Sequence, residues 1–225
     1  VCKDGIVYVA DMIGEDPTSV RYIRKYSIKG GYLGDLVRLG DRKEVGCLCL
    51  SSDGESLYAG YTFRDAAGTI DKISLADGTV TQLASGCGTI RQIAVDGKGH
   101  LFAGNRGGAM SIVSEATGEI LTTVAGDVSG SQGVAYDPVN DCCWWSVMKT
   151  TRYGTFSFAE PAVVTMGLTR TDGTWGDHCF ALATLDGVPY FGSFSDKCIH
   201  RRNTDGTCSK VKDESGADIT YPASI

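Results

Sequence analysis

The sequence is poor in the residues and motifs that would identify a chemical activity directly. It contains only 3 His and 5 Pro among 225 residues, and none of its cysteines forms the Cys-x-x-Cys pair that is typical of zinc sites. It has no Gly-x-Ser-x-Gly motif, which excludes the nucleophile elbow of an α/β-hydrolase. Its apolar runs stay well below the roughly 18 residues that cross a bilayer. We therefore expect no metal site, no cofactor and no membrane insertion.

A surplus of basic residues is also lacking. The formal net charge is −6 and the isoelectric point is near 5.0, whereas a nucleic-acid-binding protein normally carries a basic patch or stripe. Short basic clusters at 21–25 and 200–202 fall in strand-like stretches, and we interpret them as solvated strand faces. Nucleic acid is therefore not an expected partner.

The cellular compartment stays open at this point. The 9 Cys fit buried thiols that act as small hydrophobes, or a secreted domain with about two to four disulfides and one odd Cys. The absence of any Asn-x-Ser/Thr acceptor leans against a glycosylated secreted protein. The sequence begins Val-Cys without Met, so we expect either a removed leader or a piece of a longer protein. Extracellular and cytoplasmic locations both remain compatible.

What the sequence does contain is a repeated unit of a turn followed by a strand. Residues 51–60, Ser-Ser-Asp-Gly-Glu-Ser-Leu-Tyr-Ala-Gly, combine an Asp-Gly turn with a strand that includes an aromatic residue. An Asp-Gly pair between such runs is a strong hairpin signal. Related turns begin at Asp4, Asp53, Asp96, Asp137 and Asp186, which follow one another at intervals of 41 to 49 residues. A second series of turns lies between them, at 30–31, 77–78, 117–118, 160–161 and 205–206.

Each unit therefore predicts four short strands, called a to d, with one turn series joining a to b and the other joining c to d. Units of 40–50 residues with four strands are typical of β-propeller blades, and no stretch keeps a helical periodicity beyond a turn or two. The first unit starts at its a–b turn, and residues 219–225 form a lone strand that can supply the missing strand a. Closing the ring in this way removes the exposed sheet edges.

We predict an all-β protein that forms a single five-bladed β-propeller of four-stranded antiparallel blades, closed by the C-terminal strand. The expected blades are 219–225 with 1–44, then 45–86, 87–128, 129–174 and 175–218. An alternative makes 219–225 the first strand of a truncated sixth blade. The adjacent Trp144 and Trp145 lie in a predicted strand and face opposite ways, so we expect each to pack against a different neighbouring blade.

The repeats resemble those of a known class of propellers. Residues 93–104, Ile-Ala-Val-Asp-Gly-Lys-Gly-His-Leu-Phe-Ala-Gly, and residues 133–140, Gly-Val-Ala-Tyr-Asp-Pro-Val-Asn, resemble the NHL repeat, and residues 51–60 resemble the YVTN repeat. The resemblance covers nearly the whole chain and extends more loosely to Trp-Asp repeat proteins, although the Trp-Asp dipeptide is missing from every blade. It implies a β-propeller, and its motifs mark blades and not chemistry.

A binding site is expected where the b–c and d–a connections meet around the channel mouth, because loops on a rigid scaffold often carry function. Residues that close strand b would form a polar, partly basic funnel there with nearby arginines, and the 171–178 loop adds a Trp that can stack on a sugar or clamp a side chain. The candidate ligand-binding residues are Asp11, Tyr61, Arg64, Asn105, Arg106, Arg152, Trp175, Asp177, His178, Ser193 and Asp196. We assign no catalytic residue, because most Asp side chains belong to turns in which they bond the backbone.

These features favour a non-enzymatic binding module that engages a protein or glycan partner through the loops at the channel mouth. One alternative is a small-molecule hydrolase or lyase that uses carboxylates on the same face, drawn from Asp16, Asp65, Asp177 and Asp196. A second alternative is a structural repeat domain that acts as a scaffold within a larger assembly. Propellers host many unrelated activities, so the fold alone does not decide between them.

Overall fold

The computed structural model describes residues 1–12, 21–40, 44–62, 67–126, 130–147, 152–166, 169–170, 179–193 and 197–219. All regular elements in these ranges are strands, and they form five sheets in which neighbouring strands are antiparallel, apart from one short parallel pair. Within the same ranges no helix is long and apolar enough to cross a membrane. The all-β fold predicted from the turns is confirmed.

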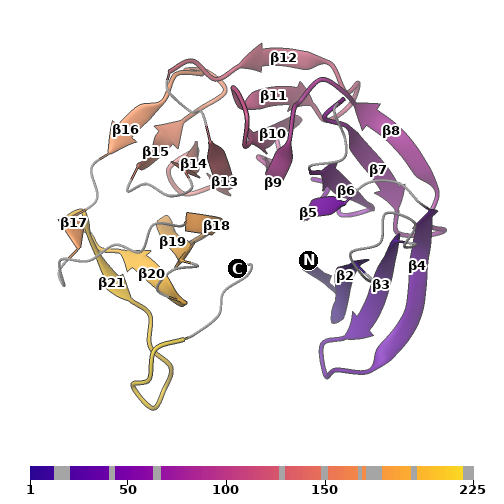
Figure 1. Ribbon diagram of the computed structural model, residues 1–225, viewed down its shortest axis with the longest axis horizontal. Coiled ribbons are helices and arrows are strands. Elements are labelled where there is room, and N and C mark those ends of the chain that lie inside the picture. The colour runs from indigo at the N-terminus through magenta and orange to yellow at the C-terminus, as the bar shows by residue number, and fades with distance from the viewer. Residues whose placement is uncertain are drawn as a thin grey trace.

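Sheets 1 to 5 follow one another along the chain, and each extends from an inner strand near the centre to an outer strand at the rim (Figure 1). Sheet 1 comprises β1 (Cys2–Lys3), β2 (Ile6–Met12), β3 (Arg21–Ser27) and β4 (Tyr32–Gly40). Sheet 2 comprises β5 (Val45–Leu50), β6 (Ser56–Tyr61), β7 (Ile70–Ser74) and β8 (Val80–Ala84). Sheet 3 comprises β9 (Ile90–Val95), β10 (His100–Asn105), β11 (Ser111–Ser114) and β12 (Ile120–Thr123).

Sheet 4 comprises β13 (Ser131–Asp137), β14 (Cys142–Val147), β15 (Tyr153–Phe156) and β16 (Val164–Met166). Sheet 5 comprises β18 (Cys179–Leu185), β19 (Val188–Ser193), β20 (Cys198–Arg202), β21 (Thr207–Lys210) and β17 (Thr169–Arg170). The last of these, β17, was expected within the blade at 129–174, but it pairs in parallel with β21 at the rim of sheet 5. The chain therefore crosses to the next blade before its inner strand begins.

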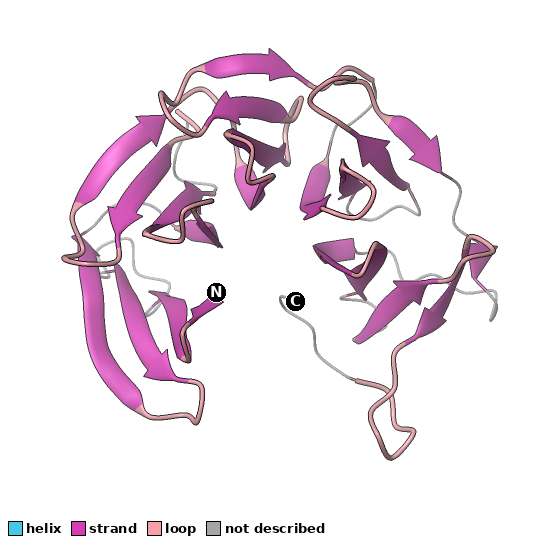
Figure 2. Ribbon diagram, turned by 180° about the vertical axis from the view of Figure 1, so that it is seen from behind, coloured by secondary structure: helices cyan, strands magenta, loops and turns pink. Residues whose placement is uncertain are grey.

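The five sheets stand around a central axis as an arc that is open between sheet 1 and sheet 5 (Figures 1 and 2). The strand expected to close the ring falls almost entirely on residues 220–225, which lie outside the described residues. The structure adds one detail at that place. Sheet 1 has a two-residue inner strand of its own, β1, which pairs with Ile6 and Val7 of β2.

Each boundary between successive sheets is filled by one apolar cluster, since strand side chains alternate between the two faces of a sheet. The boundary between sheets 3 and 4, for example, buries Phe102, Val134 and Trp145. Trp145 is fully buried there, whereas the adjacent Trp144 packs with Phe191 at the boundary between sheets 4 and 5. The prediction that the two tryptophans contact different neighbouring blades is confirmed.

The second series of turns also contributes to the packing between blades. Gly118, in the turn that joins β11 to β12, has a φ of 75° and lies so close to β8 that an added methyl group would collide with the Leu83 carbonyl oxygen. Gly78 occupies the equivalent turn of sheet 2 and lies in the same way against the Leu36 carbonyl of β4. Glycine is therefore required at these turns both by the backbone conformation and by the close approach of the preceding sheet.

Candidate functional site

The channel mouth is the end of the arc where the b–c and d–a connections lie, and its best-described part is the sector between sheets 2 and 3. The backbone N–H of Thr62 donates to Glu44 O at 2.9 Å, and the N–H of Cys87 donates to Gly68 O at 3.0 Å. Gly68 and Gly88 approach each other so closely that no side chain fits at Gly68. These contacts hold the b–c connection of sheet 2 against the two connections that lead into sheets 2 and 3.

Asn105 organises the adjoining part of the mouth, at the end of β10. Its side-chain oxygen accepts hydrogen bonds from the backbone N–H of Thr89 at 3.1 Å and of Gly107 at 2.9 Å. Its amide nitrogen donates to Ala109 O at 3.3 Å. An Asn side chain that replaces missing backbone partners in this way defines a tight turn. Asn105 therefore sets the path of the loop that presents Arg106.

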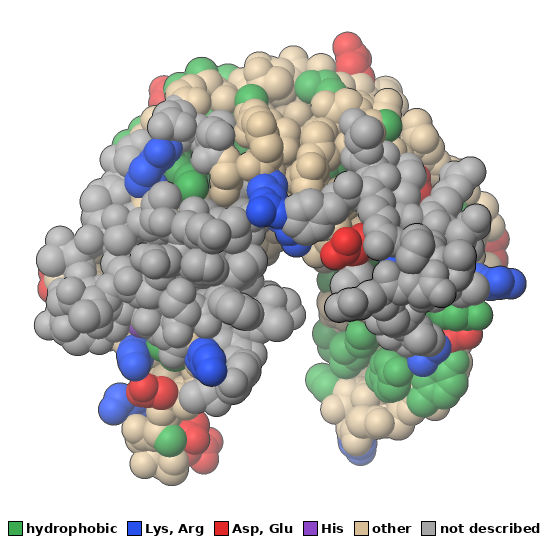
Figure 3. Space-filling view, viewed as in Figure 1, with side chains coloured by type: hydrophobic (Ala, Val, Ile, Leu, Met, Phe, Trp, Pro, Cys, Tyr) green, Lys and Arg blue, Asp and Glu red, His purple; other side chains and the backbone are tan. Residues whose placement is uncertain are grey.

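The sector carries a small group of charges. Arg91 of β9, Arg106 and Glu44 are all partly exposed. Burial, followed by the nearby Arg106 guanidinium, lowers the pKa of Arg91, whereas Glu44 raises it. Arg91 stays protonated despite its lowered pKa. Figure 3 views the molecule as in Figure 1 and shows Lys and Arg side chains at the inner rim over β9, beside an acidic side chain over β5. Arg91, Arg106 and Glu44 thus leave a small excess of positive charge among the described residues of this part of the rim, on a chain whose net charge is −6.

The structure places the predicted site residues in different environments. Tyr61 is 1% exposed and its hydroxyl donates to Asp71 at 2.6 Å inside sheet 2. Ser193 is fully buried, and Asn105 is 9% exposed with its polar atoms bonded to the loop. Residues that close strand b thus point into the blades. Arg106 and Arg152 are partly exposed at the mouth end of their strands.

Other predicted residues are not described. The side chain of Asp11 and the residues Arg64, Trp175, Asp177, His178 and Asp196 lie outside what the structure describes, so their ligand-binding role stays a prediction. Arg91 and Glu44 were missed by the sequence analysis. Arg91 follows a buried Ile in the inner strand β9. It lies at the mouth because the loop end of sheet 2, with Glu44, is beside it, and the sequence does not show this contact.

Two described pockets lie at the opposite end of the blades, the turn face, where the a–b and c–d turns meet. The larger, of about 340 Å³, is lined by Ser52, Tyr58, Lys72 and Glu115 among others. The Glu115 carboxylate accepts hydrogen bonds from the Ser52 N–H at 2.6 Å, the Ser52 hydroxyl at 2.5 Å and the Tyr58 hydroxyl at 3.1 Å. Its oxygens are therefore engaged in joining sheets 2 and 3.

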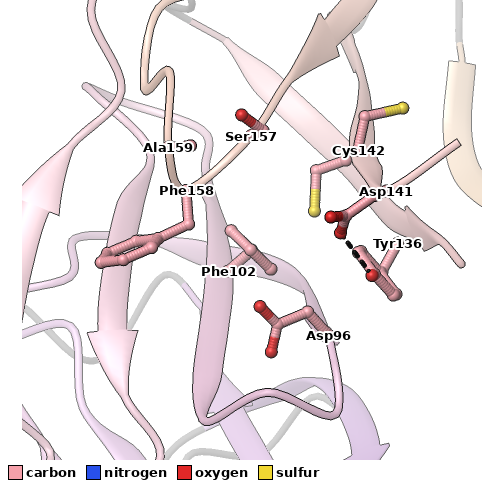
Figure 4. A pocket seen from close by; sticks show the side chains of 9 residues that line it. Asp96, Phe102, Tyr136, Asp141, Cys142, Ser157, Phe158 and Ala159 are labelled. Carbon is pink, nitrogen blue, oxygen red and sulfur yellow. Dashed lines mark hydrogen bonds between the residues drawn. The ribbon is translucent and has the colours of Figure 1, made fainter.

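The smaller pocket, of about 160 Å³, lies between sheets 3 and 4. Figure 4 shows the Asp141 carboxylate turned toward the Tyr136 hydroxyl, which donates to it at 2.7 Å, and Lys98 pairs with the same carboxylate at 2.6 Å. On the other side, Asp96 pairs with the His100 ring at 2.6 Å. The His100 ring in turn stacks on Phe158 with ring centroids 3.7 Å apart. The Asp141 carboxylate and the Asp96–His100 pair of this pocket are thus engaged within the protein, as are the Glu115 oxygens of the larger pocket.

The described residues offer neither a metal-binding cluster nor a reactive thiol among Cys47, Cys49 and Cys87. No cluster of three metal-ligating side chains occurs there. Cys47 and Cys49 of β5 are thiols, and burial raises the pKa of both to about 12. Burial also raises the pKa of Cys87 to about 11. Thiols of such high pKa are poor nucleophiles at neutral pH, which agrees with the interpretation of these cysteines as small hydrophobes.

Known proteins resemble this chain in structure and not in sequence. No protein-family model matches it, and no curated protein sequence matches it. A solved structure of a nidogen/laminin complex superposes with a TM-score of 0.70 at 17% identity, covering 91% of this chain and 73% of that chain. Virginiamycin B lyase from Staphylococcus aureus was solved as a catalytically inactive variant with quinupristin. It superposes with a TM-score of 0.64 at 14% identity, covering 85% of this chain and 66% of that chain. The WD40 repeats of RRP9 superpose with a TM-score of 0.61 at 15% identity, covering 79% of this chain and 53% of that chain.

The chain is a β-propeller. Since all three identities lie below 20%, the resemblance concerns the fold alone. This chain spans about half the length of the RRP9 chain, and the arc of five sheets is accordingly shorter than the whole of that protein.

Proposed function

We propose that this propeller is a non-enzymatic binding module that engages an acidic segment of a protein partner at the channel mouth. The observation that carries the proposal is the position of Arg91 and Arg106. The two guanidinium groups lie close enough for that of Arg106 to lower the pKa of Arg91. Arg91 belongs to β9, and Arg106 lies on the loop that Asn105 holds, next to the contact of Gly68 with Gly88. Guanidinium groups are suited to carboxylates, which they bind in a bidentate way.

The preorganisation of the sector supports a binding role. A loop that is already ordered loses little conformational entropy when a partner docks, which favours affinity. The small excess of positive charge at this part of the rim also steers anionic segments toward the mouth. The nidogen/laminin structure is a complex of two proteins, so a propeller fold of this kind is compatible with protein binding. Nucleic acid remains an unexpected partner on account of the overall negative charge.

Two further functions depend on residues outside the described ranges. Glycan binding would require Trp175 to stack on the sugar. Hydrolase or lyase activity would require two converging carboxylates among Asp16, Asp65, Asp177 and Asp196. The fold resemblance to virginiamycin B lyase concerns the scaffold and not those residues. A scaffold role within an assembly needs no site at all. The binding module is preferred because Arg91 and Arg106 lie together at the mouth.

The test uses two fluorescein-labelled decapeptides, one with Glu at alternate positions and one with Gln in the same places. Fluorescence polarisation should show tighter binding of the Glu peptide to the wild-type protein and weaker binding as salt rises. The Arg106→Glu variant should lose at least about tenfold in affinity, as expected for reversal of a charge that contacts a carboxylate. Arg201→Glu is the matched control, because Arg201 is exposed on β20 of sheet 5.

Equal binding of the two peptides, or equal losses in the two variants, would contradict the proposal. A glycan array with the wild-type protein and Trp175→Ala then addresses the glycan alternative. Binding of a sugar that is abolished by Trp175→Ala would favour that alternative over the acidic peptide.

A further inference from the structure

Glu44 is fixed by its backbone at the point where the chain enters sheet 2. Its carbonyl oxygen accepts hydrogen bonds from the Thr62 N–H at 2.9 Å and from the Thr62 hydroxyl at 3.3 Å. Thr62 is fully buried, so the start of β5 is tied to the end of β6. In the described part of the chain Glu44 is bonded only through this carbonyl, which leaves its carboxylate available to a partner.

Close packing of sheet 2 on sheet 3 brings this end of β5 to the start of β9. An added methyl group at Gly46 of β5 would lie 2.6 Å from the Ile90 carbonyl oxygen, and one at Gly60 of β6 would lie 2.6 Å from the Ile90 side chain. Only glycine therefore allows these two backbones to approach β9 so closely. Glu44 lies two residues before Gly46, and Arg91 directly follows Ile90, so both lie at this contact.

A β-bulge directs Arg91 toward sheet 2. The pairing of β9 with β10 passes from Ile90 to Gln92, which makes Arg91 the extra residue of the strand. Gln92 reaches sheets 4 and 5, whereas Ile93 packs in the cluster between sheets 2 and 3. Since side chains alternate along a strand, Arg91 lies on the same face as Ile93. Bulges commonly re-aim a side chain next to a binding site.

The same irregularity occurs near the mouth end of all four long inner strands. The extra residues are Gly46 in β5, Arg91 in β9, Gln132 in β13 and Phe180 in β18. The bulge is thus a feature of the blade, and only in sheet 3 does it carry a charged residue. Position 91 therefore provides a cation that the equivalent positions of the other sheets do not.

Arg106 completes the group. Its N–H donates to the Thr89 carbonyl oxygen at 2.9 Å, which ties the loop after β10 to the start of β9. Burial and then Arg106 lower the pKa of Arg91, whereas Glu44 raises it. Two cations and one anion therefore share one electrostatic neighbourhood at the boundary between sheets 2 and 3.

This arrangement penalises a segment that carries negative charge alone. A partner carboxylate that reaches the arginines also approaches Glu44, and juxtaposed like charges disfavour binding. A basic side chain next to the partner carboxylate would instead meet Glu44 with the opposite sign. An interface that repels one class of ligand while it attracts another gains specificity from both effects.

We infer that Glu44 is a specificity-determining residue of the mouth, and that the preferred partner segment has mixed charge. Its acidic residue binds Arg91 and Arg106, and a neighbouring Lys or Arg binds Glu44. The inference rests on the proposed function and defines the chemistry of the partner more closely.

The test adds a third fluorescein-labelled decapeptide, in which Lys fills the positions between the Glu residues, to the Glu and Gln peptides. In fluorescence polarisation at low salt, Glu44→Gln should bind the Glu peptide about threefold more tightly than the wild type and the Glu/Lys peptide about threefold more weakly. The substitution removes a repulsion in the first case and an attraction in the second, each of the size of an exposed ion pair. Glu44→Asp keeps the charge and should retain the wild-type order of the peptides.

Glu119→Gln is the matched control. Glu119 is exposed in the c–d turn of sheet 3, at the turn face, so the variant loses the same charge far from the mouth. It should change the affinity for neither charged peptide. Equal effects of Glu44→Gln and Glu119→Gln would overturn the inference, because they would trace the change to net charge.

A change in the same direction for both charged peptides, or in neither, would also overturn the inference. These results leave intact the preference of the wild-type protein for the Glu peptide over the Gln peptide, so the proposed function would stand. Equal binding of the Glu and Gln peptides by the wild type would instead contradict the proposed function, and the inference with it.

Discussion

Gln92 and Leu182 hydrogen-bond across the channel although 90 residues separate them along the chain. The Gln92 amide nitrogen donates to the Leu182 carbonyl oxygen at 2.7 Å, and its amide oxygen accepts from the Leu182 N–H at 3.2 Å. The same oxygen accepts from the Val134 N–H at 3.3 Å. One side chain of sheet 3 therefore joins the inner strands of sheets 4 and 5.

Replacement of Gln92 by Ala should lower the free energy of unfolding by about 1–3 kcal/mol, because partly buried backbone groups of Val134 and Leu182 lose their partner. Urea unfolding followed by tryptophan fluorescence measures the change. The matched control is Gln82→Ala, since Gln82 is exposed on the outer strand β8, and it should alter the free energy by less than about 0.5 kcal/mol. Similar losses in both variants would show that the Gln92 bridge does not stabilise the arc.

The turn glycines allow a second comparison within one sheet. Gly97 and Gly118 have φ values of 70° and 75°, but an added methyl group meets nothing within 4 Å at Gly97 and the Leu83 carbonyl at Gly118. Gly97→Ala should therefore lower the free energy of unfolding by about 1 kcal/mol, from backbone conformation alone. Gly118→Ala should lower it by about 2 kcal/mol more, because the neighbouring sheet must move. Thermal and urea unfolding of the two variants side by side measure this difference, and equal effects would contradict the close approach of sheets 2 and 3.

The sequence predicted the repeating architecture because that information is local. An Asp-Gly pair between two strand-like runs defines a hairpin wherever it occurs, and the spacing of Asp53, Asp96 and Asp137 therefore located the sheets. The opposite orientation of Trp144 and Trp145 followed from the strand period in the same way. Prediction of the fold class therefore needed only these short-range patterns and the number of turns.

The candidate site depended on contacts that no short-range pattern reveals. Tyr61 was expected at the mouth because it closes a strand, but its hydroxyl finds Asp71 on the next strand, inside the sheet. The seam formed by Ser52 and Glu115 joins residues 63 positions apart. Arg91 looks like any polar residue of a strand until the end of sheet 2 is placed beside it. The sequence placed Asn105 and Arg106 at the loop end of their strand, but it did not show which side chains remain exposed there.

The cysteines should differ strongly in reactivity. Cys2 is exposed, whereas burial raises the pKa of Cys47 and Cys49 to about 12. Since the thiolate is the reactive form, iodoacetamide at pH 8 should modify Cys2 at least about 100-fold faster than either of these half-buried thiols. Mass spectrometry of peptides after timed quenching measures the rates, and the unfolded chain in guanidinium is the control in which all thiols react. Rapid modification of Cys47 in the native protein would contradict the packing between sheets 2 and 3.

Asp137 should dominate the loss of stability in acid among the turn carboxylates. It is fully buried. Burial raises its pKa, but hydrogen bonds from the Asn140 side chain at 2.7 Å and the Trp144 indole at 3.2 Å, with two backbone N–H groups, outweigh that effect and leave the pKa lowered. A lowered pKa in the folded state means that the carboxylate stabilises the fold above the unfolded pKa of about 3.9, and that this contribution is lost as the pH falls through the folded pKa.

In Asp137→Asn the free energy of unfolding should therefore fall less steeply between pH 5 and pH 2.5 than in the wild type, from a lower starting value at pH 7. Urea unfolding at half-unit pH steps measures both slopes. Asp205→Asn is the control, because Asp205 is exposed and its pKa is lowered mainly by the Thr207 hydroxyl, so solvent screening reduces its effect on stability. If the two variants had the same slope as the wild type, the hydrogen bonds to Trp144 and Asn140 would not be the source of acid sensitivity. The β14 strand would then have to be held to its turn by packing alone.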